Sequence, residues 1–187
     1  MTKKMTFSHF STYLFINFLN TIKMDNNKKG EQLNSEEDIW EWLLLMQEHG
    51  LLQPSQVTTI KQESIDVEKV RNFRDVCRNY FYHLDNKQEW MNIMMEHTMQ
   101  VPLSFVMEQE MVAIPSKGGT MGLISLLSFD LLQKEQDGIV SKVKACENNQ
   151  CLALFVNNKG KRKWCSMEVC GNRAKAKKHY YSKTNKA

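Results

Sequence analysis

The chain has 187 residues and a mass of 21.9 kDa, the size of one domain or of one domain with a small appended module. Hydrophobic residues make up 42% and charged residues 25% of the sequence, which excludes wholesale disorder. The formal net charge of +4 is unevenly distributed. Residues 142–187 hold twelve lysines and arginines and two acids, a net charge of +10, whereas residues 1–141 carry −6. This asymmetry predicts an acidic body and a basic C-terminal part that faces a polyanion.

The N-terminal segment 7–23 is rich in apolar residues at helical spacing, which predicts a helix. Polar residues interrupt the run and no small-residue cleavage site follows it, so we expect neither a secretory signal nor a membrane span. The five cysteines are an odd number, which argues against a secreted disulfide scaffold. We therefore expect a soluble protein of the reducing cytoplasm with no membrane partner.

The middle of the chain reads as a series of helices. Ser35 is expected to cap a helix with an acidic first turn, and Gly50 is expected to end it. Apolar spacing over 54–84 predicts one long or broken helix, and 87–97 predicts another.

The spacing of the apolar residues changes after these helices. Two apolar, β-rich runs flank a polar turn within 104–114, which predicts a β-hairpin. Helical spacing returns over 121–134, and 139–145 reads as a strand or an extended linker. The predicted fold is α+β: a mainly helical N-terminal domain with a small sheet over residues 1–140, followed by a cysteine module over 141–187.

Four of the five cysteines lie in the basic part, spaced C-x4-C, thirteen residues, C-x4-C: Cys146, Cys151, Cys165 and Cys170. Two short-spaced pairs joined by a hairpin-length segment are typical of a structural zinc site with a closed tetrahedral shell of thiolates. The segment between them predicts a strand over 151–156, a turn over 157–160 and a returning strand over 161–165. A small basic helix is expected after the last cysteine. Zinc would supply folding free energy that so small a module lacks.

Other uses of these cysteines are less consistent with the sequence. No secretory signal in the sequence supports disulfides, and the cysteine spacing is not the C-x-x-C of redox centres. A catalytic zinc needs an open ligand position, which four cysteines leave no room for. The fifth cysteine, Cys77, lies on an apolar helical face and is expected to be a core residue.

The string W-C-S-M-E-V-C-G-N-R-A-K over 164–175 resembles the CGNR zinc finger, which is named for the four residues 170–173. More loosely, F-L-N-T over 18–21 and V-R-N-F-R-D over 70–75 are similar to segments of the ABATE-type domain that precedes this finger in the family. The resemblance implies one structural Zn²⁺ on the four cysteines. It also implies a bacterial, stress-induced transcriptional regulator.

The basic part supplies candidates for nucleic-acid contact. They lie on the predicted hairpin and on the helix after it: Lys161, Arg162, Lys163, Arg173, Lys175, Lys177 and Lys178. Their charge suits the phosphates of a duplex, and the two arginines suit bidentate contacts to bases or phosphates. DNA is the expected partner, with RNA as an open alternative. Two further alternatives are a solvated basic tail and a protein-interaction module in which zinc is only structural.

A helical domain with a small sheet can also enclose a pocket for a small-molecule effector. Polar residues on otherwise apolar faces are the candidates: Asn17, Asn20, Thr21, Arg71 and Arg74. The alternative is that they cap helices and form ion pairs. The five histidines have no catalytic spacing and no regular glycine-rich phosphate loop is present, so we do not expect an enzyme. The sequence leaves the oligomeric state open.

Overall fold

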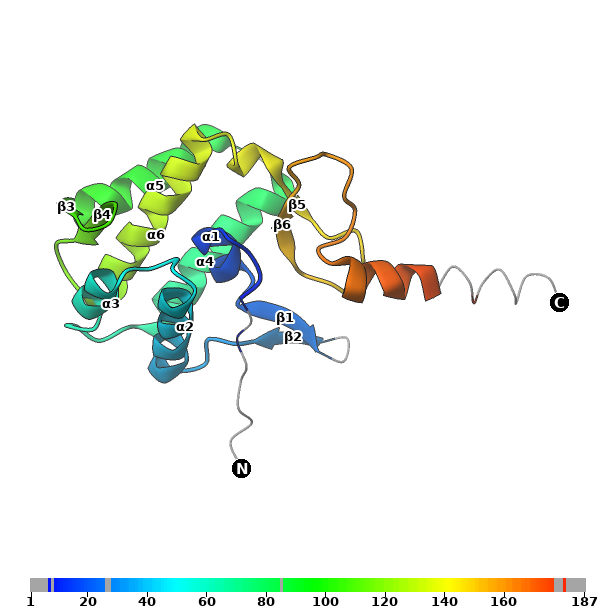
Figure 1. Cartoon of the computed structure of the whole chain (residues 1–187), viewed down its shortest axis with the longest axis horizontal. Helices are drawn as coiled ribbons and strands as arrows, with labels where there is room; N and C mark the ends of the chain where they lie inside the picture. Colours follow the sequence, from blue (N-terminus) through cyan, green and yellow to red (C-terminus); the bar gives the residue numbers. More distant parts are fainter. Residues whose placement is uncertain (1–6, 8, 26–27, 85, 177–179, 181–187) are drawn as a thin grey trace, which may run out of the picture.

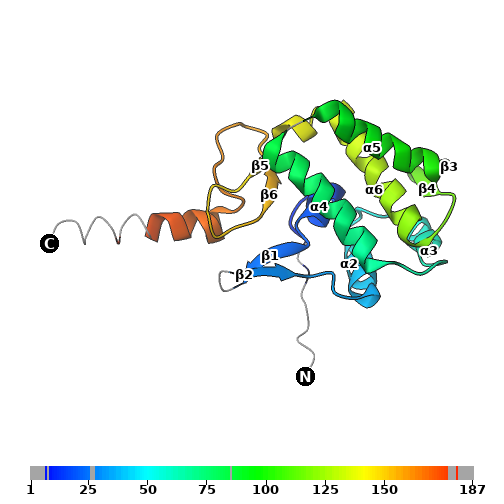
Figure 2. The same ribbon diagram turned by 180° about the vertical axis from the view of Figure 1, so that it is seen from behind.

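The computed structural model describes residues 7, 9–25, 28–84, 86–176 and 180. Within this part of the chain, helices α1 to α6 are combined with three two-stranded antiparallel hairpins, which follow α1, α5 and α6 (Figures 1 and 2). The hairpins are β1–β2, β3–β4 and β5–β6. The predicted mainly helical α+β fold, with a four-cysteine module at its C-terminal side, is confirmed. None of the described helices is long and apolar enough to cross a lipid bilayer.

Helix α1 (Leu14–Leu19) lies in the centre of the molecule, and all six of its residues are buried. It contacts α4, α6 and β6, which explains why five of its six residues are apolar. Its N-terminus is satisfied from another helix, because the carboxylate of Asp130 accepts a hydrogen bond from Phe15 N at 3.1 Å.

The longer helix predicted over 7–23 is wrong. The Oδ1 atom of Asn17 accepts from Phe10 N at 2.8 Å and from Ser11 N at 3.0 Å, which holds the preceding chain in a turn. After α1 the chain enters the β1–β2 hairpin, formed by Ile22–Asp25 and Lys28–Glu31. The hydrogen bonds of Asn17 to the backbone therefore take the place of the extra helical turns that the apolar spacing predicts.

Helix α2 (Glu36–Glu48) begins where the sequence predicts. Ser35 Oγ accepts from Asp38 N at 3.3 Å, and Asp38 Oδ2 accepts from Ser35 N at 3.0 Å, so a reciprocal capping box fixes this end. Gly50 follows the helix with φ of +68°, a conformation that favours glycine.

The predicted helix over 54–84 is broken into α3 (Pro54–Ile60) and α4 (Val67–His83). Pro54 occupies the first position of α3, and Asp66 caps α4 by accepting from Lys69 N at 3.2 Å. Helix α5 (Lys87–Gln100) then packs along α6 (Gly119–Gln136), and α4 lies beside both in the two ribbon views.

The predicted hairpin within 104–114 is confirmed as β3 (Leu103–Met107) and β4 (Met111–Pro115). Strand β4 packs on α3 and α6 through buried residues, whereas most of β3 is exposed. This hairpin lies at the opposite end of the molecule from the cysteines (Figure 1).

After α6, a 3₁₀ turn (Val140–Lys142) leads into β5 (Val143–Ala145), which pairs with β6 (Leu154–Val156). Val140, Val143 and Leu154 are buried in the same hydrophobic core as the helices of the body. The core therefore runs across residue 140, and the division of the chain into two domains there stays a prediction.

The returning strand predicted over 161–165 is absent, since β6 pairs with β5 instead. The turn before it is present: Gly160 has φ of +69°, and the Asn157 side chain bonds to both backbone groups of Arg162. A π-helical turn, Met167–Gly171, then continues as α-helix through residue 176, so the basic helix begins as expected. Lys177 and Lys178 lie outside the described residues.

Candidate metal centre and nucleic-acid interface

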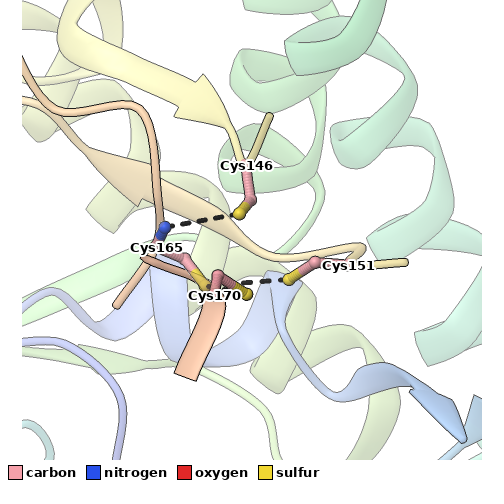
Figure 3. A group of neighbouring side chains, drawn as sticks. All are labelled: Cys146, Cys151, Cys165 and Cys170. Carbon is pink, nitrogen blue, oxygen red and sulfur yellow. Dashed lines mark hydrogen bonds between the residues drawn. The ribbon is translucent and has the colours of Figure 1, made fainter. Parts of the chain in front are cut away.

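The four predicted zinc ligands come together at one point (Figure 3). All four sulfur atoms lie within 4.8 Å of one another. The Sγ atoms of Cys151 and Cys165 are 3.7 Å apart, and those of Cys165 and Cys170 are 3.6 Å apart. A tetrahedron with Zn–S bonds of about 2.3 Å has S···S edges of about 3.8 Å, whereas a disulfide needs about 2.05 Å. The spacing is that of a four-thiolate zinc site and not of disulfides.

Each sulfur is positioned by a different piece of backbone. Cys146 follows β5, Cys151 stands in the loop before β6, and Cys165 and Cys170 flank the start of the C-terminal helix. Backbone amides face the sulfurs: Cys165 N donates to Cys146 Sγ at 3.4 Å, and Ala153 N donates to Cys151 Sγ at 3.5 Å. Such N–H groups stabilise the charge of metal-bound thiolates and orient them.

The cysteine pKa values are spread apart. Hydrogen bonding from the Cys165 thiol lowers the pKa of Cys151 to about 5. The pKa of Cys165 is raised, chiefly by its hydrogen bond to Cys151, and burial raises the pKa of Cys170 to about 11. These opposed shifts arise from hydrogen bonds among closely spaced thiols, and a divalent cation would replace the thiol protons with a single central charge. Four sulfur donors in this geometry fit Zn²⁺ with no open coordination position.

The residues around the cluster explain its local sequence. Phe155 is buried against the cysteines and Trp164 packs on them, which shields this side of the cluster from water. Ser166 Oγ accepts from Val169 N at 3.3 Å and caps the helical turn that carries Cys170. A Cβ atom on Gly171 would lie 2.8 Å from the Met167 sulfur, so a larger residue there would have to displace the flexible Met167 side chain.

The loop between Cys151 and β6 is bonded directly to the helical body. Leu152 O accepts from Arg78 Nη2 at 2.7 Å and from Tyr82 Oη at 2.9 Å, while Arg78 Nη1 also donates to Leu19 O. Arg78 is only 6% exposed, and Arg78 and Tyr82 were not among the predicted site residues. The signal that points to Arg78 is its position on α4, four residues after Arg74 and next to the buried Cys77. The zinc module and the body are therefore joined by side chains as well as by the shared core.

Five of the seven predicted nucleic-acid residues lie within the described part of the chain, and all five are exposed: Lys161, Arg162, Lys163, Arg173 and Lys175. Arg173 and Lys175 stand on the C-terminal helix, and neither forms an ion pair with any described residue. Lys163 Nζ lies 3.5 Å from a carboxylate oxygen of Glu147. Arg173 also lines a cavity of about 260 Å³ between the cysteines and β1.

Arg162 is held by its own loop. Its Nε donates to Trp164 O at 2.9 Å, its Nη2 donates to Cys165 O, and its guanidinium carbon lies 4.6 Å from the centre of the Phe155 ring. These contacts give Arg162 a part in supporting the metal site. Its predicted contact to a base or phosphate stays a prediction.

The five predicted effector residues have internal partners. Asn17 bonds to the backbone before α1, and Asn20 bonds to both backbone groups of Leu154. Thr21 Oγ1 donates to Phe18 O and accepts from Arg74 Nη1 at 3.2 Å. Arg71 Nε donates to Leu33 O.

Arg74 makes the strongest contact of this set. It is fully buried and forms a bidentate pair with Glu31, with distances of 2.6 and 2.7 Å. The structure thus gives the five residues roles in holding α1, the β1–β2 hairpin and β6. Effector binding by them stays a prediction.

Comparison with protein families agrees with the geometry. Residues 142–183 match the profile of the CGNR zinc finger. This stretch contains all four clustered cysteines. No curated protein matches the chain at a significant level. The C-terminal module is thus a CGNR-type zinc finger with a single structural zinc site, as the sequence predicts.

Proposed function

We propose that the chain is a transcriptional regulator of the stress-response type that binds DNA through its zinc finger, while the helical body senses a small molecule. The observation that carries the proposal is the exposed positive charge on a metal-ordered frame. Between residues 142 and 176, eight lysines and arginines are exposed against two exposed acids, Glu147 and Glu168. A rigid basic surface of this kind suits phosphate contacts better than a solvated tail does.

The helix after Cys170 supplies the central contacts in this proposal. Arg173 and Lys175 are exposed and unpaired among the described residues, so no internal ion pair must be broken when they bind phosphate. Lys161 and Lys163 extend the positive surface on the preceding loop. Lys177 and Lys178 continue the same sequence beyond the described helix. The closed thiolate shell leaves the metal a structural role, and we propose no catalytic activity.

Fluorescence anisotropy of the full-length, zinc-loaded protein with a random DNA duplex tests the proposal. The full chain is needed because β5 and β6 share the core of the body. If about five cationic side chains contact phosphates, log K falls against log salt with a slope of about −4 to −5. Arg173→Ala should weaken binding and reduce that slope by about one.

Lys117→Ala is a matched control, because it removes one exposed positive charge from the loop between β4 and α6. It should leave both affinity and slope unchanged. RNA of the same length distinguishes the two nucleic acids. If neither duplex shows salt-dependent binding, the regulator proposal is wrong, and a protein-interaction module with a structural zinc accounts better for the same charge.

A further inference from the structure

A second cavity, of about 330 Å³, opens at the other end of the molecule, away from the zinc site. It is bounded by α6, by the segment that joins α2 to α3, and by the β3–β4 hairpin. Ligand sites in proteins begin at about 300 Å³, so this cavity suits a small organic molecule. None of the five predicted effector residues lines it.

The least exposed carboxylate at this cavity is that of Asp130, on α6. Its Oδ2 accepts from Phe15 N at 3.1 Å, and among the described residues Oδ1 has no hydrogen-bond partner. Burial raises the pKa of Asp130 to about 6, so the group is ionised at neutral pH although its surroundings disfavour the charge. A carboxylate in this state gains free energy from a cation placed beside it.

Lys134 is the one described cation that lines the cavity, and its charge acts on Asp130 without forming an ion pair with it. Lys134 lies one turn further along α6, and its Nζ lies 3.3 Å from a carboxylate oxygen of Asp137. Glu110 adds a second carboxylate to the lining. The balance of charge at the cavity therefore favours a positive ligand.

The rest of the lining combines apolar side chains with three glutamines, Gln53, Gln56 and Gln133, and it is partly open to solvent. Phe105 is 50% exposed and Met111 is 66% exposed, although both belong to the hairpin that borders the cavity. The ring of Phe105 meets that of Phe129 edge to face, with centroids 5.6 Å apart. An apolar group of a ligand would cover these side chains, and the aromatic rings also attract cations.

We propose that this cavity binds a small organic cation, a protonated amine attached to an apolar group, with Asp130 as the partner of the ammonium. Calling this ligand an effector rests on the proposed function, but its binding does not depend on nucleic acid. The alternative is that Asp130 serves only to cap α1 through Phe15 N. Asp130→Asn separates the two roles, because an amide oxygen still accepts from Phe15 N while the negative charge is lost.

Benzylamine is a suitable probe, with benzyl alcohol as its neutral match. Titrations of the full-length, zinc-loaded protein at pH 7.5, followed by NMR, should show saturable benzylamine binding with a dissociation constant of about 0.1–10 mM. The amine should bind at least about tenfold more tightly than the alcohol, as expected for one charge-assisted contact. Asp130→Asn should weaken amine binding by the same factor and leave the alcohol unaffected.

Glu68→Gln removes a carboxylate from an exposed position on α4 and is the matched control, which should bind the amine as the parent protein does. Phe105→Ala changes an exposed side chain and provides a second test, with weaker binding of both probes, if Asp130→Asn folds poorly. The proposal is wrong if benzylamine does not saturate, if amine and alcohol bind equally, or if Asp130→Asn binds the amine normally. DNA binding of the Arg173→Ala variant is measured in the absence of amine. The DNA-binding proposal and the amine-binding proposal can therefore fail independently.

Discussion

The side chain of Asn20 pairs with Leu154 in the way that one strand pairs with another. Its Nδ2 donates to Leu154 O at 2.8 Å, and its Oδ1 accepts from Leu154 N at 2.9 Å. Asn20 follows α1, whereas Leu154 begins β6, three residues after the zinc ligand Cys151. Both residues are buried, so these bonds are shielded from water and tie the metal site to the centre of the body.

Asn20→Ala would leave both backbone groups of Leu154 buried without partners. We expect a loss of about 2–4 kcal/mol in the free energy of unfolding, and faster zinc release to a chelator because the loop that carries Cys151 is loosened. Urea denaturation and a colorimetric zinc-release assay measure the two effects. Asn92→Ala, at an exposed site on α5, should change neither.

Loss of the ion pair between Arg74 and Glu31 should strongly lower the free energy of unfolding. Burial alone would raise the pKa of Glu31 and lower that of Arg74, but their mutual hydrogen bonds reverse both shifts. Arg74→Ala removes the bidentate partner of the Glu31 carboxylate, which keeps only Arg71 Nε at 3.8 Å and two backbone amides, and should cost about 3–5 kcal/mol. Lys69→Ala removes an exposed pair with Asp66 and should cost less than about 1 kcal/mol. Urea denaturation of both variants provides the measurement.

The same pair has a defined pH dependence. Because the pKa of Glu31 is lowered on folding, its contribution is present above its unfolded value and is lost as the pH falls through its folded one. In Arg74→Ala the part of that acid-side loss that comes from Arg74 disappears. The stability difference between the parent protein and this variant should therefore shrink from pH 7 to pH 3, and a constant difference would show that the pair is not the cause.

Much of this arrangement follows from local sequence. The capping box of Ser35 and Asp38 sets the start of α2, and the two apolar runs around 108–110 form the hairpin they predict. The cysteine spacing and the match over 142–183 identify the metal site, because ligands on short turns are set by neighbouring residues.

Contacts between distant segments were not predictable in the same way. A strand over 161–165 fits the local pattern, but β6 pairs with β5 because that places Val143 and Leu154 in the common core. The polar residues 17, 20 and 74 sit on apolar faces, which also suits a ligand pocket. Only the fold shows that Asn17 bonds to the backbone before α1, that Asn20 pairs with Leu154 and that Arg74 pairs with Glu31.

Zinc content and thiol reactivity test the metal site directly. Protein purified without added metal should contain about one zinc per chain, since the four sulfurs form a closed site. Cys165→Ser should lose the metal, whereas Cys77→Ala should keep it, because Cys77 is fully buried in α4 and distant in sequence from the cluster. Elemental analysis measures the metal.

Chelation should expose a defined number of thiols. After zinc removal under native conditions, a thiol reagent should modify the four cluster cysteines while Cys77 stays protected, because burial raises the pKa of its thiol and excludes the reagent. Rapid modification of all five would mean that the body unfolds together with the zinc site. Circular dichroism of the same sample separates these outcomes, since most helical residues lie before residue 140.

The titration of Asp130 should make the fold less stable as the pH rises, which is opposite in sign to the effect of Glu31. Its pKa is about 6 in the folded protein against an ordinary value of 3.8, so the folded state binds the proton more tightly. The stability that this group contributes is fully present below about pH 4 and is lost as the pH rises through about 6. Asp130→Asn carries no titrating group and should gain up to about 3 kcal/mol relative to the parent between pH 4 and pH 7.5. Urea denaturation at a series of pH values measures the difference, in which the contribution of Glu31 cancels because both proteins contain it. A difference that is flat with pH would show that the Asp130 carboxylate is well solvated, and the cavity beside it would then have no unbalanced charge to offer a cation.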